Sequence, residues 1–174
     1  MGDILDKLKG GDLRSIGKAD EVVVEILKDE TLFAEVFQGV FNQEAVVRMR
    51  ASDVLEKVSR IHPGYLQCVK RQLIEVVSNI EQQEVRWHVA QMLPRLELQA
   101  NEIVEVLDIL IGWLKNSKSN IVKVNSIQAL ADIAEQHNEY KLFVVRNIEE
   151  AMLGTSSAVI NRGKKLLEKL NAKW

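Results

Sequence analysis

Hydrophobic residues along this chain recur at intervals of three and four, which is the spacing of one face of an α-helix. The clearest segment, residues 32–41, carries Leu32, Phe33, Val36, Phe37, Val40 and Phe41. No segment alternates apolar and polar residues with the period of two that marks a strand. The pattern therefore predicts an all-α protein, with helices at roughly 12–28, 30–42, 44–60, 63–80, 83–98, 102–116, 119–137, 139–153 and 156–172.

A short motif recurs in the same register every 37 or 38 residues. A Val begins each copy and a Leu follows eight positions later, in the pairs Val47 and Leu55, Val85 and Leu93, Val122 and Leu130, and Val159 and Leu167. A repeat of this length is typical of stacked helix pairs. We number the positions in each copy from its leading Val, which is position 0.

Positions 0, +4, +7, +8 and +11 lie on one face of a helix, because each residue advances the helix by about 100°. Position +4 is mostly small, with Ala51, Val89, Ser126 and Gly163 in the four copies. We expect small residues there to let neighbouring helices approach closely. One helix pair cannot bury this face alone, so the pattern predicts that adjacent pairs stack.

The opening of each motif helix resembles the HEAT repeat. Val47-Arg48, Val85-Arg86 and Val122-Lys123 carry the resemblance, which covers about residues 44–170. The last copy departs from the pattern, because Ile160 stands where a basic residue belongs. The resemblance implies a right-handed α-solenoid of about four to five antiparallel helix pairs, whose second helices line a concave face.

We expect one helical-repeat domain over residues 1–174. Its expected parts are an N-terminal capping helix at 1–11, repeat units at 12–42, 43–81, 82–117 and 118–154, and a C-terminal capping helix at 155–174. Pro63 favours the start of a helix, Gly154 favours an end, and Pro94 favours a kink. The basic C-terminal segment, with Lys173 and Trp174 last, is interpreted as a solvated cap.

Position +2 offers a candidate binding surface. It holds Met49, Trp87 and Val124, with Asn161 in the last copy, and it lies about 200° from the leading Val. Met and Trp are common at binding surfaces. If they are exposed, these side chains form an apolar row for a partner. The alternative is that neighbouring helices bury them.

Two polar positions flank this row. Position +1 gives Arg48, Arg86 and Lys123, and position +3 gives Arg50, His88, Asn125 and Arg162. Together they predict a basic strip for a carboxylate-rich peptide or a phosphate backbone. The alternative is that these side chains bond to acidic residues or loop carbonyls of the adjacent unit.

Composition narrows the function classes. The 174 residues are 47% hydrophobic and 28% charged, as in globular proteins. The net charge of −2 gives no general attraction to nucleic acid. A single cysteine, Cys68, excludes an intramolecular disulfide and favours a reducing compartment. The longest apolar stretch, 103–114, contains Glu105 and Asp108, so we expect a cytoplasmic protein without a membrane partner.

No residue set predicts catalysis, a metal site or a cofactor. The histidines His62, His88 and His137 lie far apart, and no phosphate-loop, dinucleotide or nucleophile motif is present. We expect a non-catalytic scaffold that binds a protein or peptide on its concave face through Met49, Arg50, Trp87, His88, Val124, Asn125 and Arg162.

Two alternatives remain open at this point. One is nucleic-acid binding through the basic strip, in outline like the HEAT-like DNA-alkylation-repeat glycosylases. The other is an enzyme or enzyme accessory, since the phycobilin lyases carry catalysis on HEAT-type arrays.

Overall fold

The computed structural model describes residues 4–172, and this range contains helices and no strand. The predicted all-α helical-repeat class is confirmed. The chain divides into two compact units, Met1–Glu97 and Leu98–Trp174. No helix in the described range is long and apolar enough to cross a membrane.

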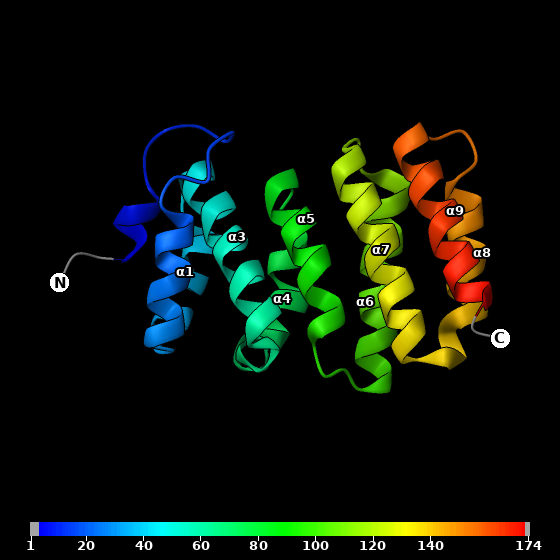
Figure 1. Cartoon of the computed structure of the whole chain (residues 1–174), viewed down its shortest axis with the longest axis horizontal. Coiled ribbons are helices and arrows are strands. Elements are labelled where there is room, and N and C mark those ends of the chain that lie inside the picture. Colours follow the sequence, from blue (N-terminus) through cyan, green and yellow to red (C-terminus); the bar gives the residue numbers. More distant parts are fainter. Residues whose placement is uncertain (1–3, 173–174) are drawn as a thin grey trace. The chain divides into compact units, whose positions relative to one another are not determined.

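Unit 1 begins with a 3-10 turn and alternates longer helices with short helical segments. Its elements are η1 (Ile4–Leu8), α1 (Ala19–Lys28), α2 (Leu32–Gln38), η2 (Gly39–Phe41), α3 (Ala45–Ile61), η3 (Pro63–Val69), α4 (Lys70–Glu75), η4 (Val77–Asn79), α5 (Gln83–Met92) and η5 (Leu93–Arg95). Helix α3 packs against both α1 and α5, and the three lie side by side in Figure 1. Helices α3 and α5 carry the first two copies of the motif.

Unit 2 consists of α6 (Ala100–Asn116), α7 (Asn120–Gln136), η6 (Asn138–Tyr140), α8 (Lys141–Ala151) and α9 (Ser157–Ala172). Helix α7 packs against α6, α8 and α9 (Figure 1). Helices α7 and α9 carry the last two copies of the motif. We call α1 and the motif helices first helices, and α2, α4, α6 and α8 second helices.

The repeated face is the core of each unit. In the first three copies, every residue at positions 0, +4, +7, +8 and +11 is buried. In the last copy only Leu167, at position +8, is partly exposed. Each fully buried Val or Leu contributes about 1.5–3 kcal/mol, so this face drives the stacking of neighbouring helices within each unit.

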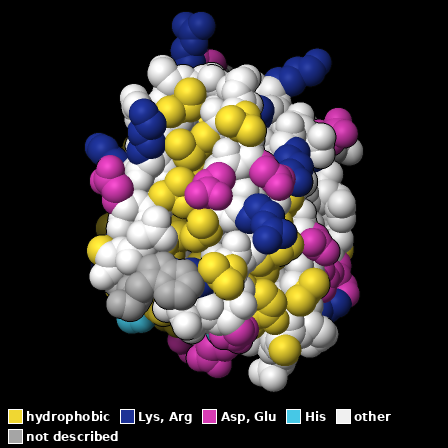
Figure 2. Space-filling model, turned by 90° about the vertical axis from the view of Figure 1, so that its right-hand side faces the viewer, with side chains coloured by type: hydrophobic (Ala, Val, Ile, Leu, Met, Phe, Trp, Pro, Cys, Tyr) yellow, Lys and Arg dark blue, Asp and Glu magenta, His cyan; other side chains and the backbone are white. Residues whose placement is uncertain are grey.

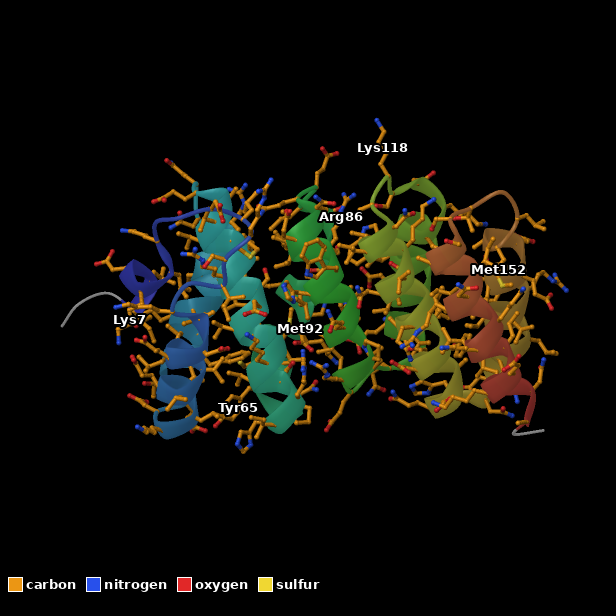
Figure 3. The ribbon with its side chains drawn as sticks, turned by 45° about the horizontal axis from the view of Figure 1, so that its top comes forward. Lys7, Tyr65, Arg86, Met92, Lys118 and Met152 are labelled. Atoms are coloured by element: carbon orange, nitrogen blue, oxygen red, sulfur yellow. The ribbon has the colours of Figure 1, made fainter. Side chains whose placement is uncertain are left out.

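Small residues at position +4 permit close helix contacts, as predicted. A Cβ atom on Gly39 would lie 3.0 Å from the Cβ of Ala51, so η2 approaches α3 at its +4 residue. A Cβ atom on Gly163 would lie 2.6 Å from the sulfur of Met152, which is labelled in Figure 3. The side chain of Met152, the residue that follows α8, therefore packs against the backbone of α9 at the equivalent position.

Helix boundaries differ from the prediction in several places. Helix α1 begins at Ala19 rather than near residue 12, because Gly10, Gly11 and Gly17 have positive φ and shape a loop instead. The helix predicted at 63–80 is divided into η3, α4 and η4.

Pro94 was expected to kink a helix, but the helix ends there instead. Helix α5 stops at Met92, and the chain continues as the 3-10 turn η5. Pro63 starts a helical turn, and Gly154 has positive φ after α8, as expected. Lys173 and Trp174 lie outside the described residues.

Candidate functional site

Arg50 is enclosed by the loop that precedes α1. Its Nη1 donates hydrogen bonds to the carbonyl oxygens of Leu8 (3.0 Å), Lys9 (3.1 Å) and Gly10 (2.7 Å), and its Nε donates to Ser15 O (3.0 Å). Only 2% of the residue is exposed. The prediction that Arg50 belongs to an exposed basic strip is wrong, because the loop buries the side chain and accepts hydrogen bonds from its Nη1 and Nε.

The +1 arginines are also used inside unit 1. Arg48 Nη1 donates to the carbonyl oxygen of Asn42 and Arg48 Nε donates to Gln82 Oε1, both at 2.8 Å. Arg86 Nε donates to the carbonyl oxygen of Ile80 at 2.9 Å. At these two positions the alternative of bonds to loop carbonyls is confirmed. Arg48 also ties the start of α3 to the residue preceding α5.

The +3 side chains reach position +6 of the preceding motif helix in both units. His88 Nε2 lies 4.0 Å from Asp53 Oδ1 in unit 1. Arg162 Nη2 donates to Gln128 Oε1 in unit 2. Asn125 instead donates to the carbonyl oxygen of Ile121 on its own helix at 2.9 Å. Arg162 thus connects consecutive first helices by a hydrogen bond, whereas His88 lies near the preceding one without a hydrogen bond to it.

The +2 row is not a continuous exposed surface. Met49 is only 5% exposed, because α1 and α5 cover both sides of α3. Trp87 and Val124 are half-buried, and Asn161 is exposed. The alternative, in which neighbouring helices bury this position, is confirmed at Met49.

Ion pairs at position +10 connect the first helices, and the sequence reasoning missed them. The pairs are Lys57 with Asp20 (2.7 Å), Arg95 with Glu56 (2.7 Å) and Lys169 with Glu135 (2.6 Å). The acidic residues lie on α1, α3 and α7. Each basic residue lies on the next of the first helices in the chain, or, for Arg95, on the turn that follows it. The signal was present, since three of the four copies carry Lys or Arg at +10.

Glu56 is the most enclosed member of these pairs, with no exposed surface. Its Oε1 accepts hydrogen bonds from Arg60 Nε (2.8 Å) and Arg95 Nη2 (2.7 Å). Burial by itself raises the pKa of Glu56, but the hydrogen bonds and charges of Arg60 and Arg95 outweigh it and hold the pKa below its usual value. This carboxylate is therefore ionised and fully occupied by structural partners.

His88 lies beside this cluster. Burial lowers the pKa of His88, and the nearby charges of Asp53 and Glu56 only partly oppose that effect. Its Nδ1 atom is buried without a hydrogen-bond partner. The imidazole is consequently neutral at pH 7. Its role is to pack between helices, and it supplies no positive charge for binding a partner.

Helix α8 in unit 2 presents apolar side chains to the outside. Leu142 is 67% exposed and Phe143 is 46% exposed, while Val144 and Ile148 on the opposite side of the helix are buried. Arg146, one turn further along, is exposed and has no hydrogen bond or ion pair to any residue in the described range. Figure 2 shows the α8–α9 side of unit 2, where hydrophobic side chains form a band flanked by charged ones.

The comparisons with known proteins give a single finding on family. A family model described as the HEAT repeat domain matches residues 11–165 of the chain. No curated protein and no solved structure matches it.

Proposed function

The chain belongs to the HEAT-repeat family, and we propose that it is a non-catalytic helical-repeat scaffold that binds a protein or peptide partner. The second helices are the proposed contact surface, because in the family resemblance they line the concave face. Within unit 2, we assign the main contact to the first two turns of α8, at Leu142, Phe143 and Arg146.

The observation that carries this proposal is the exposure of Leu142 and Phe143 beside an unpaired Arg146. Adjacent large apolar side chains that face water favour association, since each one buried contributes about 1.5–3 kcal/mol. Arg146 lies three or four residues away, within reach of the same partner segment. This combination suits a peptide with an apolar anchor next to a carboxylate.

The buried charges of unit 1 support a structural interpretation over a catalytic one. The fully buried Glu56 accepts hydrogen bonds from Arg60 and Arg95, and the buried Arg50 donates to loop carbonyls. We also propose a cytoplasmic location, supported by the free thiol of Cys68, which is exposed.

Site-specific photo-crosslinking tests the proposed contact surface. A photoreactive amino acid replaces Phe143 in one protein and Ile121 in another, because Ile121 is 53% exposed and lies at the start of α7 in the same unit. We expect discrete crosslinked species from cell extract at position 143 that are absent at position 121. No crosslinked species at 143, or the same species at both positions, would contradict the proposal.

Charge substitutions extend this test. Phe143→Glu is expected to abolish the crosslinks made from a second photoreactive group at position 142. Ile121→Glu, the matched control, is expected to leave them intact. Circular dichroism and thermal unfolding of both variants verify that unit 2 stays folded.

A further inference from the structure

A cationic hollow of about 500 Å³ lies in unit 1, where residues 9–18 pass beside α3. Its charged lining consists of four cations and one carboxylate: Lys7, Lys9, Lys18, Arg50 and Asp6. The remaining lining is small, with Gly10, Gly11, Ser15 and Gly17. Figure 3 labels Lys7, on η1 near the beginning of the chain.

Two of the four cations are neutralised and two are not. Lys7 pairs with Glu25 at 2.5 Å, and Lys9 pairs with Asp6 at 2.6 Å. Lys18 is exposed and has no ion pair or hydrogen bond from its side chain to a residue within 4–172. The partners of Arg50 are carbonyl oxygens, which carry no full charge. The hollow therefore holds excess positive charge.

The guanidinium of Arg50 also has unused donor capacity. Its Nη1 donates to three carbonyl oxygens, but its Nη2 has only the carbonyl oxygen of Asp12, at 3.5 Å. That distance is beyond the usual range of a good N–H···O bond. A buried cation with unspent donors strongly favours an anionic acceptor.

Gly11 keeps the space next to this nitrogen open. A Cβ atom at position 11 would lie 3.1 Å from Arg50 Nη2. Gly10, the neighbouring residue, has nearly the same positive φ, but a Cβ there would meet nothing within 4 Å. A Cβ atom at Gly17 would lie closer still, 2.7 Å from Arg50 Cζ and 2.8 Å from its Nη1, so Gly11 and Gly17 together leave the space beside Arg50 open.

We propose that this hollow binds the phosphoryl group of a small phosphorylated molecule, with Arg50 Nη2 and Lys18 as its charged partners. A phosphoryl group brings up to two negative charges and three acceptor oxygens, which matches two uncompensated cations. A hollow of this volume also accommodates the organic part of a small ligand.

NMR titration of the full chain tests the site directly, independently of the proposed scaffold function. Inorganic phosphate and phenyl phosphate are the two probes, each added at fixed pH with the ionic strength held constant by chloride. We expect saturable shifts of the amide signals of Gly10, Gly11, Gly17 and Lys18 with both probes. Absence of saturable shifts at these residues overturns the proposal. Shifts with inorganic phosphate alone overturn the assignment to a phosphorylated small molecule.

Two matched variant pairs identify the residues involved. Lys18→Gln is expected to weaken phosphate binding about two- to fivefold, whereas Lys164→Gln, at an exposed lysine of α9, is expected to leave it unchanged. Equal affinities for both variants overturn the role of Lys18. Gly11→Ala is expected to weaken binding more than Gly10→Ala, which has the same backbone strain but leaves Arg50 open. Equal effects of the two alanines overturn the role of Arg50.

Discussion

Arg95 on the turn after α5 donates a hydrogen bond of 2.7 Å to the fully buried carboxylate of Glu56 on α3. The same guanidinium also donates to Ser59 Oγ and to the carbonyl oxygen of Glu56. Arg95, which follows the second motif helix, therefore makes three hydrogen bonds to the first motif helix. Hydrophobic contact is not directional, so a buried ion pair of this kind is suited to fixing the register between stacked helices.

Arg95→Met is the first test of this relationship. Glu56 would keep Arg60 but lose its second guanidinium, and we expect unit 1 to lose about 2–3 kcal/mol of unfolding free energy. Urea denaturation measures the loss. The matched control is Lys169→Met, because the Lys169–Glu135 pair is partly exposed and its removal should cost less than about 1 kcal/mol. Equal losses in the two variants would show that burial of the pair is unimportant.

The lowered pKa of Glu56 should also make the unfolding free energy of unit 1 depend on pH in the acid range. Its pKa in the folded protein is lowered, so the unfolded chain takes up a proton at Glu56 first as the pH falls. The stabilisation is complete above the ordinary glutamate pKa of about 4.3 and is lost as the pH falls through the folded value. Glu56→Gln should flatten this part of the curve of unfolding free energy against pH. An unchanged slope in Glu56→Gln would assign the acid sensitivity to other carboxylates.

The lowered pKa of His88 should make the unfolding free energy depend on pH nearer neutrality. Burial lowers its pKa in the folded protein, so the unfolded chain binds a proton at His88 in preference to the folded one. The contribution to stability is complete above the ordinary histidine pKa of about 6.5 and decreases as the pH falls toward the folded value. Urea denaturation at about pH 7.5 and 5.5 measures it. His88→Gln should reduce the difference between the two values, and His62→Gln, at an exposed residue, should not.

The core was predictable because it depends on residues close together in the chain. Val85, Val89 and Met92 lie on one helix, and their spacing alone places them on a common face. The environment of Arg50 was not predictable in this way. Its partners belong to a loop about 40 residues earlier, and no periodicity connects the two.

The +10 ion pairs lie between these extremes. Lys57, Arg95 and Lys169 share a position in the repeat, so their alignment was visible in the sequence. Their ion pairs were not visible, because each pair depends on which acidic residue of the neighbouring helix the basic side chain faces. The exposed Phe143 was missed as well, because an apolar residue of a helix is identified as exposed only once the neighbours of that helix are known.

Two glycines at close helix contacts should respond differently to the same substitution. Gly39→Ala places a Cβ 3.0 Å from the Cβ of Ala51, which is fixed to the backbone of α3, and 2.8 Å from a terminal carbon of Leu5. We expect Gly39→Ala to lose about 1–3 kcal/mol of unfolding free energy because of overpacking.

Gly163→Ala meets the sulfur and Cγ of Met152, a flexible side chain that is only half-buried. Met152 can rotate away, and alanine is favoured over glycine inside α9 by about 1 kcal/mol. The expected change at position 163 is therefore within about 1 kcal/mol of zero, by urea denaturation. A large loss in Gly163→Ala that the additional change Met152→Ala fails to relieve would show that the backbones themselves are in contact there.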